Sequence, residues 1–109
     1  MTQEIFGSKW QDDVVALACE NADLDIATSG TDTLIVRAVF GGAIASQRKD
    51  NSNFTFAVVD APASTATGTT VGANTGIVSA GTQKGTAVIS ITLTNYPNVP
   101  PAYATVTVG

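Results

Sequence analysis

Residues 86–94 read TAVISITLT, a stretch in which apolar side chains recur at every second position. Ala87, Ile89, Ile91 and Leu93 share one face of this stretch. Residues 102–108, AYATVTV, repeat the pattern, with Ala104, Val106 and Val108 on the apolar face. A two-residue period is typical of β-strands that bury one side. Both stretches are therefore predicted to be strands that contribute to one core.

The rest of the chain from Ala22 onward shows the same short alternating segments, separated by turn residues. Further strands are predicted at residues 23–28, 33–40, 54–59, 69–71 and 76–80. Residues 46–53 form an exposed loop or a frayed edge, and the proline-rich residues 96–101 form a connection, because proline cannot donate to a sheet. This spacing is typical of an all-β sandwich or barrel. Phe56 and Ile89 are expected to be buried on facing sheets.

Composition excludes several classes of function. The chain has 109 residues, enough for one domain, and has no histidine and one cysteine. Histidine-dependent catalytic triads and histidine-based zinc sites are therefore excluded. No pair of acidic and basic residues is a candidate for catalysis. We expect neither an enzyme nor a bound cofactor or metal. Five basic residues and a net charge of −4 argue against nucleic acid as a partner. Cys19 is expected to be a buried small hydrophobe.

The start of the chain lacks the features of a secretory signal, and no apolar run approaches the roughly 18 residues that a membrane span needs. We therefore expect a protein that is made and stays in the cytoplasm, without a membrane anchor.

Residues 1–21 are predicted to be an arm that precedes the sandwich at residues 22–109. Seven of the nine acidic residues lie in the first 32 positions, and the arm carries Ile5, Phe6 and Trp10, the only tryptophan. Trp10 and its neighbours fit an amphipathic helical turn, whereas the pair Val14 and Val15 fits a strand equally well. Two placements remain open. The arm either reaches a neighbouring subunit or folds back across its own sandwich.

Two further groups of charged residues are candidate sites. Arg48 and Lys49 lie in the polar loop, where they either meet an acidic partner or are simply solvated. Five aspartates, Asp12, Asp13, Asp23, Asp25 and Asp32, supply possible calcium ligands. Their spacing does not match an EF-hand loop, so a solvated acidic face is the preferred interpretation. The predicted partner-binding residues are Ile5, Phe6, Trp10, Arg48 and Lys49.

The second half of the chain resembles the bacterial immunoglobulin-like domain of group 2, known as BIG2. The resemblance lies in Gly76, Val78 and Ala80 before a turn, in Gly85-Thr86-Ala87 at the start of an Ile-rich strand, and in a Val106-Thr107-Val108 ending. Upstream, SGTDTLIVRAVF resembles a strand of the family through Gly30 and Leu34 or Ile35. The buried tryptophan usual in the family is replaced, because Phe54-Thr55-Phe56 occupies the corresponding stretch.

This resemblance implies an all-β, immunoglobulin-like sandwich of about seven strands with an N-terminal extension. It also implies an adhesive or spacer module, of the kind found in bacterial surface adhesins and in bacteriophage virion proteins. The chain has its own start and shows no signal and no tandem repeat, which favours the virion over an exported adhesin. We expect a capsid decoration or cement protein that binds the major capsid protein or other virion proteins, is assembled into the virion in the host cytoplasm, and forms a homo-oligomer on the particle. Alternatives are a tail or tail-fibre accessory protein and a cell-surface adhesion or carbohydrate-binding module.

Overall fold

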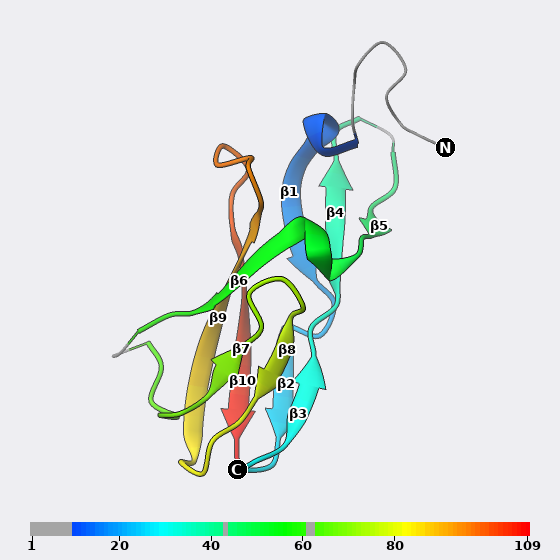
Figure 1. Cartoon of the computed structure of the whole chain (residues 1–109). Helices are drawn as coiled ribbons and strands as arrows, with labels where there is room; N and C mark the ends of the chain where they lie inside the picture. The colour runs from blue at the N-terminus through cyan, green and yellow to red at the C-terminus, as the bar shows by residue number, and fades with distance from the viewer. Residues whose placement is uncertain (1–9, 43, 61–62) are drawn as a thin grey trace.

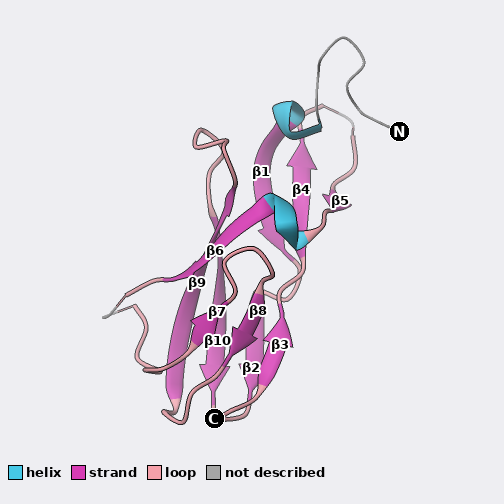
Figure 2. Ribbon diagram, viewed as in Figure 1, coloured by secondary structure: helices cyan, strands magenta, loops and turns pink. Residues whose placement is uncertain are grey.

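The described part of the chain consists of β-strands joined by loops, with two short 3-10 turns (Figure 2). A computed structural model of the chain describes residues 10–42, 44–60 and 63–109. The strands in these ranges are β1 (Val14–Cys19), β2 (Asp23–Ile26), β3 (Thr31–Thr33), β4 (Val36–Phe40), β5 (Gln47–Arg48), β6 (Phe54–Val58), β7 (Thr70–Val71), β8 (Ile77–Ser79), β9 (Gly85–Leu93) and β10 (Ala102–Val108). The two 3-10 turns are η2 (Trp10–Asp13) and η3 (Asn51–Asn53). None of the described helical segments is long and apolar enough to cross a membrane.

The strands form three hydrogen-bonded sheets, packed as a sandwich. One sheet has the order β2-β10-β9-β6, and the other two have the orders β1-β4-β5 and β3-β8-β7. β2 pairs with β10 in parallel, whereas the other paired strands run antiparallel. In Figure 1 the β1-β4-β5 sheet lies above the β3-β8-β7 sheet. The predicted all-β sandwich is thus confirmed.

The apolar faces predicted from the two-residue period are the faces that form the core. Buried residues on β9 and β10 are Ala87, Ile89, Ile91, Leu93, Ala104, Val106 and Val108. Phe54 and Phe56 are also buried, with their rings edge to face at 6.4 Å between centroids. Phe56 and Ile89 nevertheless belong to the same sheet, because β6 pairs directly with β9. Our expectation that they lie on facing sheets was wrong.

The segment predicted as one strand at residues 33–40 is divided into β3 and β4. At the break, the Asn21 side chain accepts a hydrogen bond from the Ile35 N–H and donates one to the Thr33 carbonyl, both at 2.9 Å. The Asn51 amide donates to the Leu34 carbonyl at 2.9 Å. At the break, side-chain amides therefore form the hydrogen bonds that a neighbouring strand would otherwise form with these backbone groups. The strand pairing ends there, but the backbone N–H and C=O groups still have hydrogen-bond partners.

The later part of the expected N-terminal arm belongs to the sandwich. Residues 14–19 form β1, which pairs with β4 from Val14 opposite Phe40 to Cys19 opposite Val36. Val14 is buried in the core, and the ladder has an irregularity between Val14 and Ala16. Both local structures left open by the sequence are present in part: Trp10 lies in the helical turn η2, and the strand begins at Val14. Residues 10–19 fold onto their own domain, whereas Ile5 and Phe6 lie outside the described residues.

Candidate functional site

Two of the predicted partner-binding residues meet at one end of the β1-β4-β5 sheet. Trp10, in η2, packs edge to face on Phe40 at the end of β4, with 6.5 Å between the ring centroids. The Lys49 ammonium lies 4.6 Å from the centre of the Trp10 ring and 6.0 Å from that of Phe40. These distances are typical of cation–π contacts. We call Trp10, Phe40 and Lys49 the aromatic cluster.

Strand alternation explains how Lys49 reaches the rings. Arg48 lies opposite Arg37 in the β4–β5 pairing, and successive side chains on a strand point to opposite faces. Lys49 therefore points to the core side of the sheet, where Phe40 is buried. Trp10 itself is only partly buried, so the cluster closes one end of the core and still presents an aromatic surface with a cation at its rim.

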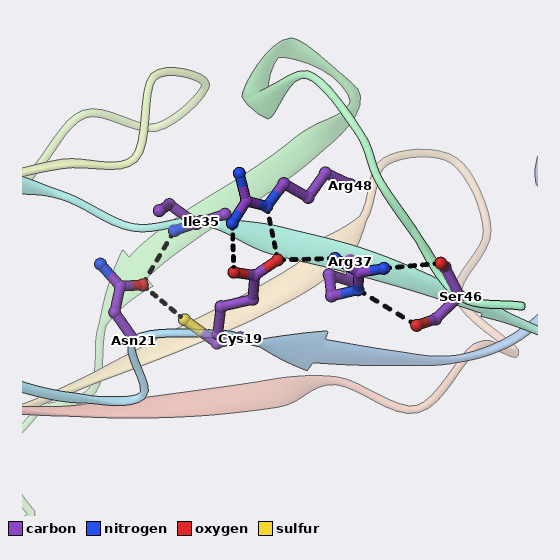
Figure 3. Close-up of polar contacts among 7 residues, drawn as sticks. Cys19, Asn21, Ile35, Arg37, Ser46 and Arg48 are labelled. Carbon is purple, nitrogen blue, oxygen red and sulfur yellow. Dashed lines mark hydrogen bonds and ion pairs between the residues drawn. The ribbon is translucent and has the colours of Figure 1, made fainter.

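Arg48 is held on the opposite face by an ion-pair network (Figure 3). Its Nε and Nη2 atoms donate to the two carboxylate oxygens of Glu20 at 2.6 and 2.7 Å, which is a two-point contact. Arg37 Nη1 donates to Glu20 Oε2 at 2.8 Å. Arg37 also donates to the hydroxyl and the carbonyl of Ser46. The network joins the end of β1 to β4 and β5.

The network keeps the Glu20 carboxylate ionised at lower pH than an ordinary glutamate. Hydrogen bonds from Arg48 and then from Arg37 lower the pKa of the Glu20 carboxyl from 4.5 to about 2. A two-point arginine–carboxylate contact also fixes geometry, because the planar guanidinium matches the carboxylate. Arg48 is therefore an exposed charge that is paired with Glu20, across the strands β4 and β5. Sequence reasoning missed Glu20, because residues 20, 37 and 48 become neighbours only through the register of three strands.

Cys19, at the end of β1, is partly buried and not fully buried as expected. Its thiol donates a weak hydrogen bond to Asn21 Oδ1 at 3.4 Å (Figure 3). Burial raises the pKa of the thiol. A thiol with a raised pKa is a poor nucleophile at neutral pH, because the thiolate is the reactive species.

A cleft at one end of the sandwich is a second candidate site. It has a volume of about 370 Å³ and lies between η2, η3 and the connection from β9 to β10. Its lining consists of Gln11, Ser52, Asn53, Thr94, Asn95 and Tyr96. We call it the loop cleft. Sequence reasoning did not single out these residues, because they come from three separate connections and form no motif.

Hydrogen bonds between distant segments shape the loop cleft. The Tyr96 hydroxyl donates to Asp12 at 3.1 Å, and the hydroxyls of Thr55 and Thr94 lie 2.7 Å apart. Asn95 has a positive φ of 70°, an uncommon backbone conformation that asparagine tolerates better than most residues. Strained backbone of this kind is often found at functional sites.

The five aspartates that could supply calcium ligands do not gather into a cluster in the described part of the chain. Among residues 10–42, 44–60 and 63–109, no group of three or more acidic, cysteine or histidine side chains lies close enough to hold a metal ion. The five aspartates are all exposed.

The site thus consists of surfaces suited to binding: an aromatic cluster with a cation at its rim and a polar cleft between loops. The sequence was compared with models of known protein families and with curated proteins, and neither comparison found a match.

Proposed function

We propose that this protein is a structural component of a bacteriophage particle, a decoration protein that binds the outside of the head and braces neighbouring capsid subunits. Its partners are the major capsid protein or other virion proteins, and it occupies the virion without acting as an enzyme. The observation that carries the proposal is the aromatic cluster, in which Trp10 is partly exposed beside the Lys49 ammonium. The resemblance of the sequence to the BIG2 domain, which occurs in virion proteins and in adhesins, is compatible with this role.

The chemistry of the aromatic cluster fits a protein interface. Tryptophan is enriched among the residues that contribute most to binding, and charged groups are favoured at the rim. In the sequence the cluster is preceded within five residues by Ile5 and Phe6. Residues 5–10 of the sequence therefore contain three large apolar residues, Ile5, Phe6 and Trp10.

Co-sedimentation with bare shells tests the proposal. Shells assembled without this protein are mixed with the intact chain, with a chain lacking residues 1–9, and with Trp10→Ala. The deletion stops at residue 9 because Val14 is buried and β1 is part of a sheet. Tyr103→Ala is the matched control, since Tyr103 is an exposed aromatic residue on the four-stranded sheet.

The intact chain and Tyr103→Ala should sediment with the shells, whereas the deletion and Trp10→Ala should bind at least about tenfold more weakly. Each variant is first shown to be folded by circular dichroism. Equal binding by all four proteins would contradict attachment through the aromatic cluster. Failure of the intact chain to bind shells while it co-purifies with tails would instead assign it to the tail.

One observation favours a second candidate, a carbohydrate-binding adhesion module. The loop cleft offers amide and hydroxyl groups beside a tyrosine ring, a combination that suits hydrogen bonding to sugar hydroxyls. Its volume of about 370 Å³ is within the usual range for small ligands. Binding to a glycan array that is lost in Asn95→Ala and in Gln11→Ala, but kept in Trp10→Ala, would support this candidate over shell attachment.

A further inference from the structure

β1 is an edge strand whose outer backbone groups have no partner strand. Among the described residues it pairs only with β4, which lies between β1 and β5 (Figure 1). The Glu20 N–H donates to the Ile35 carbonyl at 2.8 Å, so the backbone of Glu20 faces β4. In an antiparallel ladder this orientation alternates along the strand. Ala18 and Ala16 therefore face β4, and the N–H and C=O groups of Leu17 and Cys19 point away from it.

The other described edges are short, charged or covered. β5 and β7 have two residues each. β2 carries Asp23 and Asp25, and β3 carries Asp32. On β6, the Phe56 N–H and the Phe54 carbonyl are hydrogen-bonded to residues 73 and 74. Natural proteins use such features to prevent pairing between sheet edges.

β1 has none of these protections except the irregularity near Val15. Its six residues, VVALAC, carry no charge and no proline. Val15 is 53% exposed, and Ala18 is exposed as well. An uncharged apolar edge with free backbone groups is a template for strand addition.

We propose that a second copy of this chain pairs with β1 across a two-fold axis, with the two strands antiparallel and Leu17 opposite the partner's Leu17. The sequence Ala16-Leu17-Ala18 reads the same in both directions, so this register is self-complementary. The two Leu17 residues exchange two backbone hydrogen bonds, because their N–H and C=O groups point outward. The pairing creates a continuous six-stranded sheet with the order β5-β4-β1-β1-β4-β5.

Side chains also fit this register. Ala16 lies opposite the partner's Ala18 on the outer face, where small side chains leave a flat surface. Leu17 is partly buried against the core, so the two copies of its side chain cover the open edge of the sandwich together. Cys19 comes beside the partner's Val15, where the regular part of the ladder ends.

Sedimentation velocity over a range of concentrations tests the pairing in the isolated protein, without shells. The test is therefore independent of the proposed virion role, and either can fail alone. Two matched variants differ only at position 16. In Ala16→Glu/Ala18→Glu, like charges face each other across the axis, whereas in Ala16→Lys/Ala18→Glu opposite charges do. Position 18 is the same in both variants, so its contact with Arg37 in the β1–β4 pairing is also the same.

The wild-type chain and Ala16→Lys/Ala18→Glu should form dimers, and the dissociation constant of Ala16→Glu/Ala18→Glu should be about tenfold higher or more. A wild-type chain that stays monomeric at all concentrations, or two variants that sediment alike, would overturn the proposal.

Cross-linking provides a second readout that does not depend on charge. In a Cys19→Ala background, Leu17→Cys should form an intermolecular disulfide, because hydrogen-bonded antiparallel partners are about 5.5 Å apart at Cα and disulfides span about 4.4–6.8 Å. Tyr103→Cys in the same background is the control on another sheet. Leu17→Cys that cross-links no faster than Tyr103→Cys would contradict the register.

Discussion

Gly76 packs directly against the ring of Phe56: a Cβ atom at Gly76 would lie 3.0 Å from Cζ of that ring. Gly76 also has a positive φ of 68°, a conformation that disfavours other residues. The Cβ atom would also lie 2.7 Å from Nδ2 of Asn51. We expect Gly76→Ala to lower the free energy of unfolding by about 2–4 kcal/mol, from backbone strain and from crowding against Asn51 and Phe56 together. Urea denaturation measures this change.

Gly42→Ala is a matched control for backbone strain. Gly42 has a similar φ of 71°, but a Cβ atom there would meet nothing within 4 Å. Gly42→Ala should therefore cost only about 1–2 kcal/mol. Equal losses in the two variants would mean that the Gly76–Phe56 contact contributes nothing beyond the backbone term.

Phe56→Ala and Ile89→Ala should each lower the free energy of unfolding by about 2–5 kcal/mol, because truncation of a buried side chain leaves a cavity. Phe56 is 2% exposed and Ile89 is fully buried. Thr92→Ala is the control, since Thr92 lies on β9 with its side chain on the exposed face. Urea denaturation of the three variants tests the assignment, and a change below about 0.5 kcal/mol at position 56 or 89 would contradict it.

The sequence predicted best those strands whose position depends only on their own alternation. β9 and β10 were assigned with the correct inward faces, because a two-residue period is a local signal. The break between β3 and β4 could not be predicted, since it depends on the amides of Asn21 and Asn51, which are distant in sequence. The local hydrophobic pattern therefore predicted the strands. It could not predict where side-chain hydrogen bonds take the place of backbone hydrogen bonds between strands.

The candidate site was predicted in part for the same reason. Trp10 and Lys49 were selected as chemically suitable residues, but nothing in their spacing indicated that they contact each other. Arg48 was grouped with Lys49 because the two are adjacent, although strand alternation sends them to opposite faces of one sheet. Residue type thus identified Arg48 and Lys49 as candidates. Only the pairing of β4 with β5 shows that Arg48 contacts Glu20 whereas Lys49 contacts Trp10.

The ion-pair network should make stability depend on pH in the acidic range. The folded-state pKa of Glu20 is lowered to about 2, below its ordinary value of 4.5. A lowered folded-state pKa means that the contribution of Glu20 is present above pH 4.5 and is lost as the pH falls from 4.5 towards 2. Glu20→Gln should therefore be less stable than the wild type at pH 7, with the difference shrinking towards pH 2.

Urea midpoints at pH 7, 4 and 2 measure this difference, and added salt should reduce it at pH 7, because exposed ion pairs are screened. Asp60→Asn, at an exposed position outside the network, is the control and should show no such trend. A difference between Glu20→Gln and the wild type that stays constant from pH 7 to pH 2 would contradict the role of the carboxylate.

The fluorescence of Trp10, the only tryptophan in the sequence, should report on global unfolding. Trp10 packs on Phe40, and the strand that follows it, β1, is part of a sheet. Because η2 and β1 pack on the sandwich, fluorescence and circular dichroism should show coincident urea transitions, as expected for two-state unfolding. Lys49→Met keeps most of the aliphatic stem but removes the charge, so it should lower the free energy of unfolding by about 0.5–1 kcal/mol and leave the transitions coincident. A fluorescence transition at distinctly lower urea than the circular dichroism transition would show instead that Trp10 and β1 detach from a sandwich that remains folded. In that case residues 1–21 would behave as a separable arm, and attachment to a neighbouring subunit would become their main structural role.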